Sequence, residues 1–252
     1  MKKKKNKKTI VVFLIIIFFI VTLILSLTKI ISYLKDNHEN EKIREDITKN
    51  SITIIEPNID DEEQVVKYDI DFKTLKEQNP DTVAYLKVFG TNIDYVVVKG
   101  NDNSYYLNHN FNKNYNVAGW VFADYHNKFD GTDKNIVVYG HNIKDGSMFG
   151  TLKNVLNDDW RVPDNLKVLF VTEYGTYYYQ VFSTYTIEPE DYYINTIFNS
   201  DKDFESFINK IKSRSNYDYN VEVSESDKIL TLSSCTTGGL KRVVLHAKRI
   251  EN

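Results

Sequence analysis

Residues 228–250 read KILTLSSCTTGGLKRVVLHAKRI, two apolar runs joined by the turn-forming letters TTGGLK. Successive side chains of a strand point to opposite faces, so Leu230 and Leu232 share one face of the first run. The hydroxyl side chains between them share the other face with Cys235, the only cysteine of the chain. The paired glycines favour a hairpin-like return. This stretch therefore predicts two neighbouring strands, with Cys235 and Arg242 facing each other at one end.

Similar short runs rich in Val, Ile, Tyr and Phe recur upstream, separated by turn signals such as FGTN and FDGTDKN. Many short strands with few long helices predict a mainly β fold, either a barrel or a sandwich. The expected strands cover residues 83–88, 92–98, 119–124, 135–140, 166–172, 176–186, 228–234 and 243–250.

A long insertion before the cysteine strand, between Thr186 and Lys228, breaks this pattern. Four of its apolar side chains recur at positions i, i+3, i+4 and i+7, which predicts one amphipathic helix lying on the β structure. These side chains belong to Phe204, Phe207, Ile208 and Ile211.

The N-terminus combines a basic tail with a long apolar run. Residues 1–8 contain six lysines, and residues 9–28, TIVVFLIIIFFIVTLILSLT, carry no charge. About 20 apolar residues span a bilayer core as a helix, and lysines favour the cytoplasmic side. We therefore expect a single-pass membrane anchor, with a cytoplasmic N-terminus and everything after Lys29 outside. A cleaved signal peptide fits less well because the exit LILSLTKIISY has no small-residue cleavage site, and a buried core helix does not explain the polylysine start.

Beyond the anchor the chain is acidic. The whole sequence holds 32 basic and 35 acidic residues, and removing the six tail lysines leaves 26 against 35, a net charge of −9. Such a domain is a poor nucleic-acid binder, so no nucleic-acid partner is expected. Residues 29–67 predict a charged stalk or linker, partly helical. Residues 68–252 predict one extracellular domain, large enough to bury its own core.

A lone cysteine outside the cytoplasm has no disulfide partner within the chain. It forms an intermolecular bridge, acts as a free thiol, or packs as a small hydrophobic residue. Because Cys235 is grouped with hydroxyls rather than leucines, the pattern favours the functional thiol. A nucleophilic thiol requires a base or an imidazolium partner.

Five histidines are candidates for that partner. His38 lies in the charged stalk, and His246 lies four residues along its strand from Arg242, about 13 Å from the strand end at 3.3 Å per residue. His109 and His126 are flanked by aromatic residues, which favours structural roles. His141 differs because it follows the apolar run NIVVYG and opens a loop, a place where rigid sheets present catalytic groups.

These motifs together resemble the sortases, and within them class B. The matching features are TLSSC at 231–235, RVVLHA beginning at Arg242, NIVVYGHN with His141 near its end, and the segment at 79–111 followed by GWVFADY. The resemblance covers roughly residues 68–250 and implies a sortase-type eight-stranded β-barrel with a helical insertion before the cysteine strand. The family's cysteine motif usually reads TLxTC, whereas this chain has Ser234 at the position of the threonine.

The resemblance implies cysteine transpeptidation on the surface of a Gram-positive bacterium, with neither cofactor nor metal. Cys235 would attack the threonine carbonyl of a C-terminal sorting signal of LPXTG or NPXTN type and form a thioester. His141 would protonate the leaving amine and then deprotonate a peptidoglycan stem or cross-bridge amine. Arg242 would stabilise the oxyanion or hold the substrate backbone.

Four further residues are candidates for substrate binding. Ser233 shares a strand face with Cys235, which suits a hydrogen bond to substrate. Tyr192, Tyr193 and Tyr217 lie in the two loops that flank the predicted helix, and aromatic side chains offer both apolar area and a polar tip. For each of the four, a role without substrate contact explains the residue as well.

Rival functions remain open at this point. A hydrolytic cysteine peptidase would share Cys235 and His141, although the surroundings of the cysteine are not of papain type. An L,D-transpeptidase motif would place histidine and glycine directly before the cysteine, where this chain has SSC. A non-catalytic membrane-anchored binding module would make the Cys, His and Arg pattern coincidental, and labelling by a thiol-reactive probe separates it from the enzymes.

Overall fold

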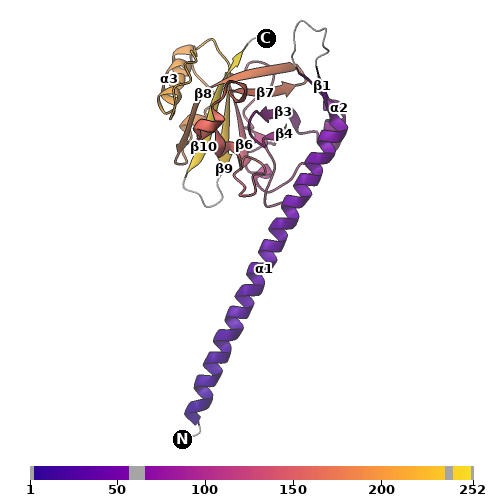
Figure 1. The fold of residues 1–252 in the computed structure, drawn as a ribbon, viewed down its shortest axis with the longest axis vertical. Coiled ribbons are helices and arrows are strands. Elements are labelled where there is room, and N and C mark those ends of the chain that lie inside the picture. Colours follow the sequence, from indigo (N-terminus) through magenta and orange to yellow (C-terminus); the bar gives the residue numbers. More distant parts are fainter. Residues whose placement is uncertain (1–2, 57–65, 236–240, 251–252) are drawn as a thin grey trace.

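The computed structural model describes residues 3–56, 66–235 and 241–250. A long N-terminal helix leads into a two-stranded sheet, and a β-barrel follows (Figure 1). The helices are α1 (Lys3–Ser51), α2 (Phe72–Gln78) and α3 (Asp201–Ser213). The strands are β1 (Ile52–Ile55), β2 (Lys67–Ile70), β3 (Thr82–Val88), β4 (Asp94–Val98), β5 (Phe122–Ala123), β6 (Asn135–His141), β7 (Lys167–Thr172), β8 (Gly175–Ile187), β9 (Ile229–Cys235) and β10 (Arg242–Ile250).

Strands β3 to β10 close into a barrel in the order β10-β8-β7-β3-β4-β5-β6-β9. The pairs β4/β5 and β6/β9 are parallel, and the other neighbours are antiparallel. The predicted strands and the mainly β fold are confirmed, and the sheet forms a barrel rather than a sandwich. The third predicted strand is the least regular, since only Phe122 and Ala123 pair as β5 and the Trp120 amide bonds to the Tyr106 carbonyl outside the sheet.

The two-stranded sheet of β1 and β2 is an element that the sequence analysis did not predict. It pairs Ile52 with Ile70 and Ile55 with Lys67 in antiparallel register. A run of four residues within a charged segment gives too little alternation for a strand to be recognised. Residues 57–65 of the expected linker, and residues 236–240 of the expected turn, lie outside the described residues.

Helix α1 is continuous over 49 residues, about 74 Å at 1.5 Å per residue. Its apolar stretch is exposed in the protein, with Phe13 and Phe18 at 63% and 64% of full exposure, and it is long and apolar enough to be a candidate membrane span. Figure 1 shows this part projecting away from the barrel. The C-terminal part behaves differently, because Asn37, Asn40 and Ile47 are buried against the domain.

The barrel core is built from alternating residues of its strands, and Leu86, Val97 and Phe170 share one face of the sheet. Burying one large apolar side chain contributes about 1.5–3 kcal/mol, so each such core residue stabilises the barrel. Helix α3 packs a second cluster against β8 and β10, where Phe182 and Val244 lie. Ser200 caps the N-terminus of the helix, and its hydroxyl accepts the Asp203 amide. Its buried residues are the four predicted ones, Phe204, Phe207, Ile208 and Ile211.

Candidate active site

The ends of β6 and β9 bring two of the predicted site residues together. The strands pair in parallel from Asn135 opposite Ile229 to His141 opposite Cys235. Neighbouring strands lie about 4.8 Å apart. The backbones of His141 and Cys235 are therefore adjacent at one edge of the barrel, although 94 residues of chain separate them.

Arg242 approaches Cys235 from the opposite side of β9. Strand β10 pairs antiparallel with β9, and Val244 lies opposite Ser233. Continuing this register by two residues places Arg242 opposite Cys235. The Ser234 hydroxyl accepts the Val243 amide at 2.9 Å, which ties the two strands together at this end. The register thus brings Cys235 and Arg242 to the same end of the barrel, and their direct opposition stays a prediction.

The imidazole of His141 has a defined orientation. Its Nε2 lies 2.7 Å from the Leu107 carbonyl oxygen. A carbonyl only accepts hydrogen bonds, so Nε2 carries the proton and the neutral ring has its lone pair on Nδ1. His141 is only 9% exposed, and its Nδ1 has no hydrogen-bond partner among the described residues. The ring thus presents one buried atom that is able to accept a proton.

The backbone of His141 is fixed by the loop that follows. Its carbonyl accepts the amides of Ile143 at 3.1 Å and Phe149 at 2.9 Å. The Phe149 ring packs directly on Gly140, where a Cβ atom would stand 2.6 Å from a ring carbon. Glycine is required at this position because any side chain would displace that ring. The glycine that ends the apolar run before His141 is therefore explained by the close packing of Phe149 on Gly140.

The four candidate substrate residues occupy different surroundings. Ser233 is 2% exposed, and its hydroxyl lies 2.9 Å from the hydroxyl of Tyr193, which is itself buried. The Tyr192 ring lies beneath Lys210, with Nζ 3.6 Å from the centroid. Tyr217 is 45% exposed and stacks under Arg161 at 4.4 Å. The insertion thus reaches the cysteine strand through Tyr193, and substrate contact by any of the four stays a prediction.

The remaining described histidines of the barrel have structural partners. His246 is fully buried between the Thr231 hydroxyl and the Tyr185 hydroxyl, each 2.8 Å away. Burial, with the positive charge of Arg214 second, lowers its pKa to about 3, so it is neutral at physiological pH. His109 bonds the Tyr105 carbonyl, and His126 bonds Asp124.

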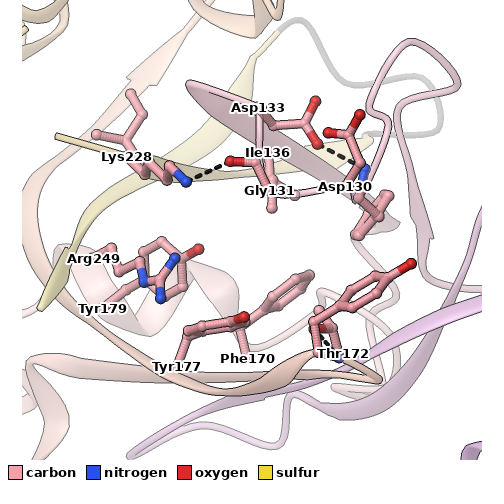
Figure 2. Close-up of a pocket in the computed structure, with 13 residues that line it drawn as sticks. Asp130, Gly131, Asp133, Ile136, Phe170, Thr172, Tyr177, Tyr179, Lys228 and Arg249 are labelled. Carbon is pink, nitrogen blue, oxygen red and sulfur yellow. Dashed lines mark hydrogen bonds between the residues drawn. The ribbon is translucent and has the colours of Figure 1, made fainter. Parts of the chain in front are cut away.

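A separate cavity of about 310 Å³ lies at the other end of the barrel (Figure 2). It is lined near the start of β6 and β9, whereas His141 and Cys235 lie six residues further along, about 20 Å at 3.3 Å per residue. Arg249 stacks on Tyr177 there at 3.8 Å, and Lys228 donates to the Gly131 carbonyl. None of its lining residues is a cysteine or histidine, so the cavity is no part of the candidate site.

Sequence reasoning missed the group that orients His141. The Leu107 carbonyl acts through its backbone, and no side-chain pattern marks a backbone acceptor. The sequence pattern was sufficient to select His141 as a candidate, because this histidine ends a strongly apolar strand.

Comparison with known families gives two matches. A model described as Sortase domain matches residues 86–250, most of the chain. A model described as Sigma factor regulator N-terminal matches residues 1–79, less than a third of the chain. That second match covers the basic tail and the apolar helix, and the barrel lies almost entirely outside it.

Curated relatives and solved structures agree with the first match. Sortase B of Listeria monocytogenes is 37% identical over 83% of this chain and 83% of its own length, and sortase B of Staphylococcus aureus is 34% identical over 71% and 75%. The crystal structure of Bacillus anthracis sortase B in complex with AAEK1 matches with a TM-score of 0.74 at 33% identity, covering 87% of this chain and all of that one. Clostridium perfringens sortase B matches with 0.68 at 36%, covering 72% of this chain and all of that one.

The chain belongs to the sortase family, and its relatives place it in class B. Membership identifies the enzyme class as cysteine transpeptidase. The barrel with its single cysteine at a strand end is the architecture that this class implies.

Proposed function

We propose that this protein is a membrane-anchored sortase that cuts a C-terminal sorting signal of LPXTG or NPXTN type after its threonine. It then joins the surface protein to a peptidoglycan stem or cross-bridge amine. The observation that carries the proposal is the parallel pairing of β6 with β9, which sets His141 opposite Cys235. A solved sortase B–substrate complex of Staphylococcus aureus, 34% identical to this chain, supports the assignment of a sortase substrate.

In the first half-reaction Nδ1 of His141 takes the thiol proton, and the Cys235 thiolate attacks the threonine carbonyl carbon. A carbon–sulfur bond forms and the carbonyl oxygen becomes an oxyanion. The carbon–nitrogen bond then breaks, and Nδ1 gives its proton to the departing amine. The products are a thioester on Cys235 and the free C-terminal fragment.

In the second half-reaction an amine of the cell wall attacks the thioester. Nδ1 of His141 accepts the proton of the incoming amine, the carbon–sulfur bond breaks, and the proton passes to the sulfur. A new amide forms and the thiol is restored. A solved sortase B complex with triglycine, 34% identical to this chain, supports a short peptide amine as the acceptor.

Arg242 stabilises the oxyanion in both half-reactions. The strand register supports this role because Val244 pairs with Ser233, and Arg242 and Cys235 each lie two residues beyond that pair at the same strand end. A guanidinium presents several donors in a fixed plane, which suits developing negative charge on an oxygen. The half-buried position of Arg242 at the start of β10 keeps the group close to solvent and to an entering peptide.

The N-terminal helix supplies the location. The apolar stretch of α1 spans the membrane once, the lysine tail stays in the cytoplasm, and the barrel lies outside the cell. Secreted proteins that carry a sorting signal are the partners on one side of the reaction, and the cell wall is the partner on the other.

The test uses the full chain in detergent micelles with a panel of sorting peptides and triglycine. Mass spectrometry is expected to detect the peptide joined to triglycine, and a thioester adduct on Cys235 in the absence of amine. The Cys235→Ala variant should lose both products while circular dichroism stays unchanged. Substantial peptide cleavage by the Cys235→Ala variant would contradict the assignment of Cys235 as the nucleophile. Hydrolysis without amine transfer would favour a peptidase, and failure of Cys235 to react with a thiol reagent would favour a binding module.

A further inference from the structure

The C-terminal part of α1 is docked on the domain. Near the start of this docked part, α1 contacts the turn at 116–119, which lies close to the Leu107 carbonyl that orients His141. The Asp36 carboxylate accepts the Val117 amide at 3.1 Å, and its backbone carbonyl accepts the Asn116 side chain at 2.9 Å. One turn on, Asn40 reaches the same loop. Asn37 donates to Asp145, four residues after His141, at 2.6 Å. Helix α1 therefore touches chain segments on both sides of the histidine.

Asn40 makes the largest number of hydrogen bonds in this contact. Its amide group exchanges two hydrogen bonds with the amide of Asn116, at 3.2 and 3.0 Å, and donates a third to the Gly119 carbonyl at 3.1 Å. Asn40 and Asn116 are 2% and 0% exposed. Buried amides hold their partners firmly because no water replaces a lost bond. The turn at 116–119 is thus clamped to the helix.

The clamped turn lies directly against the acceptor of His141. Gly119 has a φ of +60°, and a Cβ atom on it would stand 2.7 Å from the Leu107 carbonyl oxygen. The backbone N–H of Asn116 donates to the backbone carbonyl of Asn108, the residue after Leu107, at 2.9 Å. The Leu107 carbonyl and the next carbonyl along the chain are therefore in contact with the two residues that Asn40 holds.

We propose that Asn40 is a positioning residue for catalysis, acting through Asn116 and Gly119 on the Leu107 carbonyl that fixes the His141 ring. This inference rests on the proposed role of His141 in proton transfer. If the Leu107 carbonyl shifts, Nε2 loses its acceptor, and the neutral ring is free to carry its proton on Nδ1 instead. That tautomer has no lone pair facing the reaction, so it cannot take the proton of a thiol or an amine.

The test is Asn40→Ala in the full chain. The fold should survive, because the Asn116 side chain keeps its bonds to the Asp36 carbonyl and the Ala118 amide. Nitrogen-15 spectra of the histidine rings are recorded at high pH, with the His141→Ala spectrum identifying the signal of His141. The wild type is expected to show the tautomer protonated at Nε2, and Asn40→Ala a mixture of the two tautomers. Turnover should fall about tenfold while KM for the peptide stays within about twofold, as for a small misplacement of a catalytic group.

Two further variants complete the test. Asn50→Ala, on the same helix, loses only a bond to Asp46 within α1 and should match the wild type in both measurements. Asn40→Asp keeps the acceptor for Asn116 but cannot donate to Gly119, so it should shift the ring spectrum in the same direction as Asn40→Ala. It serves as the test if the alanine variant fails to fold. An unchanged His141 spectrum with unchanged turnover in the folded variants overturns the proposal. Because the spectra require no substrate, they remain decisive even if no sorting peptide is cleaved.

Discussion

Ser234 stands where the family's cysteine motif usually carries threonine, and its hydroxyl joins β9 to β10 beside the catalytic end by accepting the Val243 amide. Ser234→Ala leaves that buried amide without its acceptor, which should lower the free energy of unfolding by about 1–3 kcal/mol. It should also reduce peptide cleavage, because the same bond sets Arg242 relative to Cys235. Ser234→Thr keeps the hydroxyl and should retain near-normal stability and cleavage, measured by urea unfolding and a peptide assay. Equal behaviour of the two variants would show that the hydroxyl is not needed.

Arg242 and His141 give a second prediction at this scale. Arg242→Lys keeps the charge but loses the planar donor group, and the two side chains are not equivalent where several donors meet one oxygen. Turnover should fall by about a hundredfold or more, as for the loss of one oxyanion donor. His141→Ala should be at least as damaging. Steady-state kinetics measure both, and near-normal turnover of either variant would reassign that residue to structure.

At the scale of elements, His246 fastens β10 to its two neighbours through Thr231 of β9 and Tyr185 of β8. Burial lowers its pKa to about 3, whereas an unfolded chain has a histidine pKa near 6.5. Between these two pKa values, His246 is therefore protonated in the unfolded state and neutral in the folded state. This contribution to stability is complete above pH 6.5 and is lost as the pH falls toward 3.

The expected slope is about 1.4 kcal/mol of unfolding free energy per pH unit below pH 6.5. Urea unfolding of the wild type and of His246→Gln at pH 7.5 and pH 5 measures the difference. Glutamine does not titrate, so its variant should lose less stability on acidification even if it begins from a lower value. Parallel pH dependence in the two proteins would contradict a neutral, buried His246.

At the scale of the whole molecule, α1 divides into an exposed apolar part and a docked part. A chain that begins at Ser32 keeps every described contact between the helix and the barrel, since the docking begins near Tyr33. It should be soluble and monomeric in gel filtration. It should also cleave peptides within about twofold of the full chain, because the exposed apolar stretch of α1 makes no contact with the rest of the fold. A chain that begins at Ile52 lacks Asn40 and is expected to be much less active. A Ser32 chain that folds but cleaves no peptide would mean that the apolar stretch helps to build the site.

Much of this architecture follows from the sequence, and the exceptions have physical causes. Alternation of apolar residues marks each barrel strand, and the same alternation places Cys235 and Arg242 at one end. The parallel pairing of β6 with β9 was not predicted, because strands 94 residues apart carry no local sign of their partner. The docking of α1 was missed for a related reason. Asn37 and Asn40 have the polar character of a solvated stalk, and both are buried only because distant polar partners meet them, the Asp145 carboxylate for Asn37 and the Asn116 amide for Asn40.

Because α1 is one continuous helix, it fixes the distance between its apolar stretch and the barrel. In the proposed topology the apolar span ends near Thr28, and the first hydrogen bonds from the helix to the barrel domain come from Asp36, eight residues later. Eight residues of helix rise about 12 Å. Since Asp36 and Asn37 meet loops beside His141, the proposed topology brings this edge of the barrel close to the bilayer. In this proposed topology the candidate site lies within a thin layer above the lipid headgroups, and substrates that reach it come from that layer.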